Sequence, residues 1–186
     1  EDKKANLENL SEKINSIRDK TEIVILPEMF NTGFSMRPEI LAEKMSGDTI
    51  DWMKKICSEK KIILTVSIMV EEYDAAFQEK KKYYNRLIWM LPNGDYGFYD
   101  KRHLFAYGDE HMHFSAGNKR LIASVKGWKI NLQVCYDLRF PVWARQNLLQ
   151  NSEGGNNSHE YDLLIFVANW PEKRILAWKT LLQARA

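Results

Sequence analysis

The chain has 186 residues, 45% of them hydrophobic, which is enough to bury a large core as one domain over 1–186. Its net charge of +2, with both signs mixed along the chain, argues against nucleic acid as a partner. The longest apolar stretch, residues 62–70, is too short to cross a membrane, and two distant cysteines form no disulfide framework. We expect a protein of a reducing compartment, the cytoplasm.

Helices and strands alternate in the first third of the chain. Apolar residues at helical spacing predict an amphipathic helix over 5–20, and a short apolar run predicts a buried strand over 22–26. Gly47-Asp48-Thr49 is typical of a helix start and predicts a second helix, with an inward face of Ile50, Met53, Ile56 and Cys57. Residues 62–70 predict the next strand.

Antiparallel hairpins are predicted in the middle of the chain. The charged segment 71–82 links residues 62–70 to a strand over 84–91. Pro92-Asn93-Gly94-Asp95 then predicts a turn into a strand over 96–99.

The last third contains strands followed by helices. Residues 121–125 and 129–134 predict a strand pair, and 141–150 a helix. A buried strand is predicted over 163–168, and a final helix over 172–186. This order predicts a layered α/β fold, and the hairpins favour mixed sheets with helices outside. Because the chain opens and closes on helices, we expect it to be truncated at both ends.

Cys135 stands where an alternating strand pattern stops and a polar, proline-containing turn begins. Strand exits of this kind present reactive groups to ligands in open sheets, so Cys135 is a candidate nucleophile. Cys57, on the apolar face of a predicted helix, is interpreted as a core residue.

Two other strand exits carry groups that a thiol nucleophile needs. Glu28 follows the first strand among apolar neighbours and is a candidate general base, although a loop carboxylate in a salt bridge is equally compatible with its surroundings. Lys101 follows the strand over 96–99 and is a candidate to stabilise an oxyanion together with the backbone N–H of Tyr136. A solvated lysine beside Arg102 is equally compatible with the local sequence.

Together, these three segments resemble the nitrilase superfamily of carbon–nitrogen hydrolases, and most closely its ω-amidase branch. Glu28 lies in Leu-Pro-Glu-Met-Phe-Asn-Thr-Gly-Phe, Lys101 in Asp-Lys-Arg-His-Leu-Phe, and Cys135 in Gln-Val-Cys-Tyr-Asp-Leu-Arg-Phe-Pro. The resemblance extends to Ala-Asn-Trp-Pro at 168–171. It implies a four-layer α-β-β-α sandwich, a homodimer or larger assembly, and no metal or organic cofactor.

The resemblance also implies a mechanism. Glu28 takes the proton of Cys135, the thiolate attacks an amide carbon, and Lys101 with the Tyr136 N–H holds the oxyanion. Ammonia leaves and water hydrolyses the thioester. Relatives carry a second glutamate near the lysine, and Glu110 is the residue in that place, although it is also compatible with a surface acidic pair.

The expected reaction is hydrolysis of a small ω-amide such as 2-oxoglutaramate or 2-oxosuccinamate. A nitrile or N-carbamoyl hydrolase, and a catalytically silent binding module on the same fold, are the alternatives. Phe34, Trp143, Trp170 and Arg145 are candidates for substrate binding, whereas Arg139 is assigned to structural support. His111 and His113, expected on one face of an extended segment, suggest metal, but without a third ligand no metal site is predicted.

Overall fold

The computed structural model describes residues 2–73, 81–146, 148–149 and 158–186. The α-helices are α1 (Lys3–Asn15), α2 (Pro38–Leu41), α3 (Asp48–Lys60), α4 (Glu110–His113), α5 (Pro141–Ala144) and α6 (Ile175–Arg185). The strands are β1 (Ile23–Ile25), β2 (Ile63–Tyr73), β3 (Lys81–Met90), β4 (Tyr96–Asp100), β5 (Leu121–Val125), β6 (Trp128–Val134), β7 (Leu148–Leu149), β8 (Ser158–His159) and β9 (Leu163–Val167). Three 3₁₀ helices complete the set: η1 (Ala106–Gly108), η2 (Cys135–Arg139) and η3 (Glu172–Arg174).

Both larger sheets are mixed, as predicted. The first has the order β1-β2-β3-β4, with β1 parallel to β2 and the other neighbours antiparallel. The second has the order β5-β6-β9, with β5 antiparallel and β9 parallel to β6. β7 and β8 form a separate antiparallel pair.

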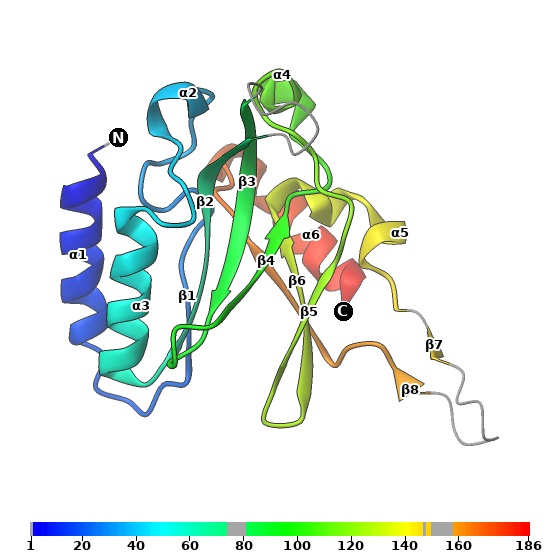
Figure 1. Ribbon diagram of the computed structural model, residues 1–186. Coiled ribbons are helices and arrows are strands. Elements are labelled where there is room, and N and C mark those ends of the chain that lie inside the picture. Colours follow the sequence, from blue (N-terminus) through cyan, green and yellow to red (C-terminus); the bar gives the residue numbers. More distant parts are fainter. Residues whose placement is uncertain (1, 74–80, 147, 150–157) are drawn as a thin grey trace.

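The two sheets stack between two layers of helices, which confirms the four-layer α-β-β-α sandwich (Figure 1). α1 and α3 cover the first sheet over a core of Ile14, Ile50, Met53, Ile56, Leu64, Val66, Ile68 and Ile88. A second core fills the space between the sheets and includes Leu87, Trp89, Tyr99, Ile130, Leu132, Val134, Ile165 and Val167. α5 and α6 lie on the side of the molecule opposite α1 and α3 (Figure 1). Because β2 is covered on both faces, its first eight residues are all buried.

The first two long helices differ from the sequence prediction at their ends. α1 stops at Asn15 rather than residue 20, where the Ser16 hydroxyl donates to the Lys13 carbonyl at 2.8 Å and so competes with the helical bonds of the last turn. α3 begins after Gly47, but no side chain of the predicted cap bonds its N-terminus. The Glu43 carboxylate instead accepts the Thr49 N–H at 3.0 Å.

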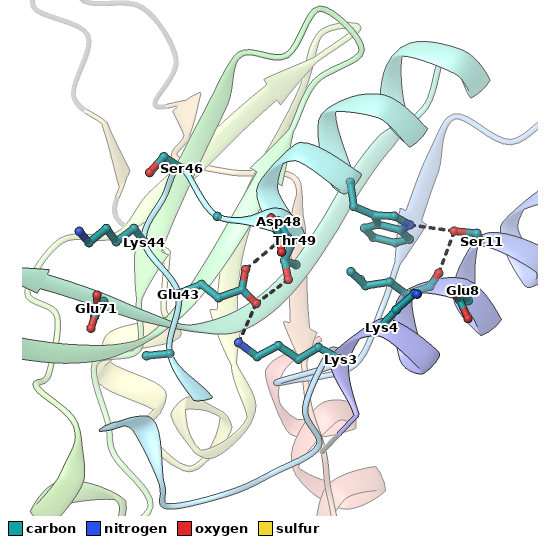
Figure 2. A pocket seen from close by; sticks show the side chains of 14 residues that line it. Lys3, Lys4, Glu8, Ser11, Glu43, Lys44, Ser46, Asp48, Thr49 and Glu71 are labelled. Atoms are coloured by element: carbon teal, nitrogen blue, oxygen red, sulfur yellow. Dashed lines mark hydrogen bonds and ion pairs between the residues drawn. The ribbon is translucent and has the colours of Figure 1, made fainter. Parts of the chain in front are cut away.

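A groove of about 610 Å³ separates α1 from the loop before α3, with Glu43 among its lining residues (Figure 2). Glu43 accepts from Lys3 Nζ at 3.0 Å and from the Thr49 hydroxyl at 2.8 Å. Trp52 Nε1 donates to Ser11 Oγ at 2.8 Å across the two helices. These contacts join α1 to α3, so the polar groups of this groove have a structural role.

The hairpin strands are longer than predicted. β2 runs to Tyr73 and β3 starts at Lys81, so the ends of the predicted 71–82 link belong to the sheet. Residues 74–80 of that link lie outside the described residues. The extension follows from continued antiparallel pairing of Glu71 with Tyr83 and of Tyr73 with Lys81.

The predicted helix over 141–150 is wrong beyond Ala144. Arg145 adopts an extended conformation, and the chain continues into β7. The Gln146 side chain accounts for this, since its oxygen accepts the backbone N–H groups of Glu160 and Tyr161 and binds the segment to the returning chain. The final helix is confirmed as η3 followed by α6. Among the described residues, none of the helices has the length and apolar character needed to span a bilayer.

Candidate active site

Glu28 lies in a tight turn after β1 that is held against β2. The Leu26 N–H donates to the Thr65 carbonyl at 2.9 Å, and the Phe30 N–H to the Ser67 carbonyl at 3.3 Å. Between them, Met29 has φ +49° and its N–H donates to Ser67 Oγ at 3.1 Å. A non-glycine residue rarely adopts this conformation, so the surrounding bonds hold a strained turn that turns Glu28 inward.

Lys101 directly follows β4 and is fixed by its own backbone. Its N–H donates to the Asn85 carbonyl at 3.0 Å, and its carbonyl accepts the Gly117 N–H at 3.0 Å. At Gly117 a Cβ would lie 2.1 Å from the Asp100 carbonyl oxygen. Only glycine allows this close backbone approach, which explains the glycine of Phe-Ser-Ala-Gly.

Cys135 begins η2 at the end of β6, with φ +45°. The turn beneath it is anchored by Asp137, which is fully buried. One oxygen of Asp137 accepts the Val134 N–H at 3.1 Å and the Tyr99 hydroxyl at 2.7 Å. The other accepts the His103 N–H at 2.9 Å and Nδ1 at 2.8 Å. Asp137 therefore ties the cysteine turn to the segment that follows Lys101.

The structure brings Glu28, Lys101 and Glu110 together in one buried cluster. Lys101 Nζ donates to Glu28 Oε1 at 2.8 Å and to Glu110 Oε2 at 2.8 Å. All three side chains are 0% exposed, so the ammonium and both carboxylates must satisfy one another. The alternatives of a surface acidic pair at Glu110 and a solvated Lys101 are wrong.

Cys135 lies within electrostatic reach of this cluster. Burial raises the pKa of its thiol, Glu28 raises it further, and Lys101 acts in the opposite direction. Burial opposes the charge on Lys101, but Glu28 and Glu110 outweigh it and raise the pKa of the ammonium above its ordinary value. The resting state is thus a thiol beside a charged lysine, and a thiolate requires that a neighbour accept the proton.

Further groups that the sequence alone did not single out complete the cluster. Asn85 Nδ2 donates to Glu28 Oε1 at 2.8 Å and to Glu110 Oε1 at 2.9 Å. The Asn169 N–H donates to Glu28 Oε2 at 3.1 Å, and the Phe105 N–H donates to Glu110 Oε2 at 2.6 Å. Asn85 does carry a signal in the sequence, since it is an amide within a predicted strand, two residues before the apolar run 87–91.

A small cavity of about 110 Å³ opens onto Cys135. Its other lining residues are Phe34, Phe105, Tyr136, Arg139, Asn169, Trp170, Pro171 and Arg174. Phe34 and Trp170 therefore lie where the sequence analysis expected substrate-binding residues. Arg139, expected to give structural support, lines the cavity instead, with its guanidinium 5.4 Å from the Trp170 ring centre. Arg174, which the sequence analysis did not consider, lies 5.1 Å from the Phe105 ring centre.

Two expected substrate-binding residues lie elsewhere. Trp143 does not line the cavity, because its indole N–H donates to the Tyr99 hydroxyl at 3.0 Å beneath the cysteine turn. Arg145 is exposed at the end of α5 and does not line the cavity either. Trp143 is aromatic and Arg145 is basic, but residue type alone does not show whether a side chain faces the cavity.

The segment with His111 and His113 is the short helix α4 rather than an extended strand, so the expected common face is wrong. Within the described part of the chain, no group of three or more His, Cys, Asp or Glu side chains is placed to hold a metal ion.

The chain is similar to known proteins along its whole length. The family model for carbon-nitrogen hydrolases matches residues 1–186. The chain is 39% identical over 183 residues to Omega-amidase YafV of Escherichia coli (strain K12), covering 98% of this chain and 63% of the relative. It is 29% identical over 167 residues to 2-oxoglutaramate amidase of Bacillus subtilis (strain 168), covering 89% of this chain and 59% of that relative.

A solved structure is similar throughout the chain. XC1258 from Xanthomonas campestris, described as a CN-hydrolase superfamily protein with an arsenic adduct in the active site, superposes with a TM-score of 0.87 at 39% identity. The match covers 99% of this chain and 66% of that one. The chain thus spans somewhat less than two thirds of the length of the relatives it matches.

Proposed function

The chain belongs to the carbon–nitrogen hydrolase family, and we propose that it forms the catalytic part of a thiol-dependent amidase. The reaction is hydrolysis of a small ω-amide, of the 2-oxoglutaramate or 2-oxosuccinamate type, to the carboxylic acid and ammonia. The observation that carries the proposal is the buried Glu28–Lys101–Glu110 cluster beside Cys135, which lines the small cavity.

The proposed first step is transfer of the Cys135 proton to Glu28, followed by attack of sulfur on the amide carbon. The oxyanion is stabilised by Lys101 Nζ and by the backbone N–H of Tyr136. The protonated Glu28 then gives its proton to the departing nitrogen, and ammonia leaves a thioester on Cys135. Water enters, Glu28 takes one of its protons, and collapse of the second tetrahedral intermediate releases the acid and restores the thiol.

The cavity supports a small, acidic amide as substrate. Arg139 and Arg174 line it, and neither forms a salt bridge with a carboxylate among the described residues. A guanidinium that is free of an internal partner can bind a substrate carboxylate through two parallel hydrogen bonds. Phe34 and Trp170 supply flat apolar walls for the carbon chain between the amide and that carboxylate.

The relatives support the same substrate class, because two of them are named as an ω-amidase and a 2-oxoglutaramate amidase. We also propose a cytoplasmic protein that assembles as a homodimer or larger. Cys57 and Cys135 are both free, as in a reducing compartment. Val142 and Leu176, 72% and 77% exposed on α5 and α6, are apolar residues that an interface would cover.

The direct test compares the protein with its Cys135→Ala variant. Each is given 2-oxoglutaramate, a matched nitrile and an N-carbamoyl acid, and ammonia release is measured. We expect ammonia from the amide with the unaltered protein only, and a thioester on Cys135 in a quenched sample by mass spectrometry. Equal rates for the two proteins would reject the nucleophile, turnover of the nitrile or carbamoyl compound alone would reject the amide, and no turnover would favour a binding module.

A further inference from the structure

Asn85 stands at the centre of the buried cluster with every hydrogen-bonding group of its side chain in use. It is 0% exposed in β3. Its amide nitrogen donates to Glu28 Oε1 at 2.8 Å and to Glu110 Oε1 at 2.9 Å, and its oxygen accepts from Ser67 Oγ at 2.8 Å. One neutral amide therefore bridges both carboxylates.

Ser67, on the neighbouring strand β2 and diagonal to Asn85 in the register, decides which way this amide points. Its oxygen accepts the Met29 N–H at 3.1 Å, which leaves the hydroxyl proton for Asn85 Oδ1. The amide oxygen is thereby held toward Ser67, and the NH₂ group must face the carboxylates. The same serine supports the strained Met29 turn that presents Glu28, so base and amide share one anchor.

The charges of the cluster show why such donors matter. Two carboxylates, Glu28 and Glu110, share one ammonium, Lys101, and Cys135 is the fourth titratable group that faces them. The next residue along β3, Arg86, points to the other face and pairs with Asp100 at 2.7 Å. A hydrogen bond to an ionised carboxylate favours its charged form, so the Asn85 amide offsets the repulsion that one lysine leaves.

We propose that Asn85, oriented by Ser67, is a positioning residue that holds the Glu28 carboxylate aimed to receive the Cys135 proton. This rests on the proposed function only in taking Glu28 as the base. The hydrogen bonds of the amide go to Glu28, Glu110 and Ser67. Its action passes through Glu28, and so it appears in the pH dependence of thiol activation.

The test follows alkylation of Cys135 by iodoacetamide from pH 4 to 9, read by mass spectrometry with Cys57 as internal reference. No substrate is needed. Asn85→Leu removes both donors at similar volume, and we expect the acidic limb of the rate profile to move up by about one pH unit. Near the foot of the limb, this is about a tenfold slower reaction. Asn131→Leu is the control, because Asn131 is an equally buried asparagine of β6 outside the cluster. Its limb should match that of the unaltered protein.

Ser67→Ala and Ser67→Thr keep the test decisive if Asn85→Leu fails to fold. Ser67→Ala should shift the limb in the same direction, and Ser67→Thr, which keeps the hydroxyl, should restore it. Folded variants with an unshifted limb would overturn the proposal even if their rates fell, since simple loss of structure lowers the rate at every pH. A shifted limb without ammonia release from any amide would reject the proposed function and leave this inference standing. Ammonia release from an amide, with the acidic limb unshifted in the variants, would support the proposed function and reject this inference.

Discussion

Replacing Lys101 by methionine tests whether the buried cluster depends on its single cation. Lys101→Met keeps the length of the side chain and removes all donation from Nζ to Glu28 and Glu110, which are 0% exposed. Removing one partner of a buried ion pair typically costs about 3–5 kcal/mol, because the remaining charge has neither water nor counter-ion. With a urea dependence of about 2 kcal/mol per molar, the unfolding midpoint should fall by about 2 M.

The sign of the pH dependence separates this cause from a packing defect. The folded-state pKa of Lys101 is raised, because Glu28 and Glu110 outweigh burial, so its contribution is complete at neutral pH and is lost only on the alkaline side. In Lys101→Met the deficit should therefore be greatest near pH 7 and shrink in acid, where the carboxylates take up protons. Urea unfolding of the unaltered protein and of Lys101→Met at pH 4 and pH 7 measures the deficit in unfolding free energy. Lys119 is exposed, so Lys119→Met is the control, and its stability should lie within about 0.5 kcal/mol of that of the unaltered protein. An equal deficit at the two pH values, or none, would refute the electrostatic reasoning.

Three further predictions concern the surroundings of the cluster. Gly117→Ala should lower the free energy of unfolding by about 3 kcal/mol, because its Cβ would lie 2.1 Å from the Asp100 carbonyl oxygen. Gly127→Ala, which has open space around the Cβ but φ +87°, should cost about 1–2 kcal/mol. Thermal unfolding compares the two variants, and equal losses would contradict the steric account. Burial raises the pKa of the Cys57 thiol to about 11, so the unfolded chain loses this proton at a lower pH than the folded protein does. The free energy of unfolding should therefore decline by up to about 3 kcal/mol between about pH 9 and 11, and by less in Cys57→Ala. Asp137→Ala leaves several buried donors without an acceptor and should cost about 3 kcal/mol and slow alkylation of Cys135; an unchanged alkylation rate would show that the cysteine turn needs no such anchor.

The layers and the strand exits could be predicted because local patterns determine them. The segments before Cys135 and Glu28 that the sequence predicts as strands are β6 and β1. Helix ends were less predictable. The helix at 141 stops at Ala144 because the Gln146 amide bonds residues 160 and 161, which no window of sequence around Gln146 contains.

The cavity wall was the least predictable part of the site. Arg139 and Arg145 are both arginines near the cysteine turn, yet Arg139 lines the cavity and Arg145 is exposed at the end of α5. Which of them faces the cavity depends on where α5 ends and on the placement of Trp170, so the distinction arises only with tertiary packing. Asn85 was missed for a different reason: an amide in a strand signals a polar role, but its partners Glu28 and Glu110 come from distant segments of the chain.

In the proposed mechanism, the pairing of one lysine with two glutamates would let the site change charge without losing its shape. If Glu28 takes the Cys135 proton, it becomes neutral and its attraction for Lys101 weakens. Glu110 still accepts from Nζ at 2.8 Å and is itself fixed by the Phe105 N–H at 2.6 Å. The ammonium is then free of one partner and anchored by the other, just as negative charge develops on the substrate oxygen. In that mechanism Glu110 would hold Lys101 in place while Glu28 changes charge, and so keep the ammonium available to the oxyanion.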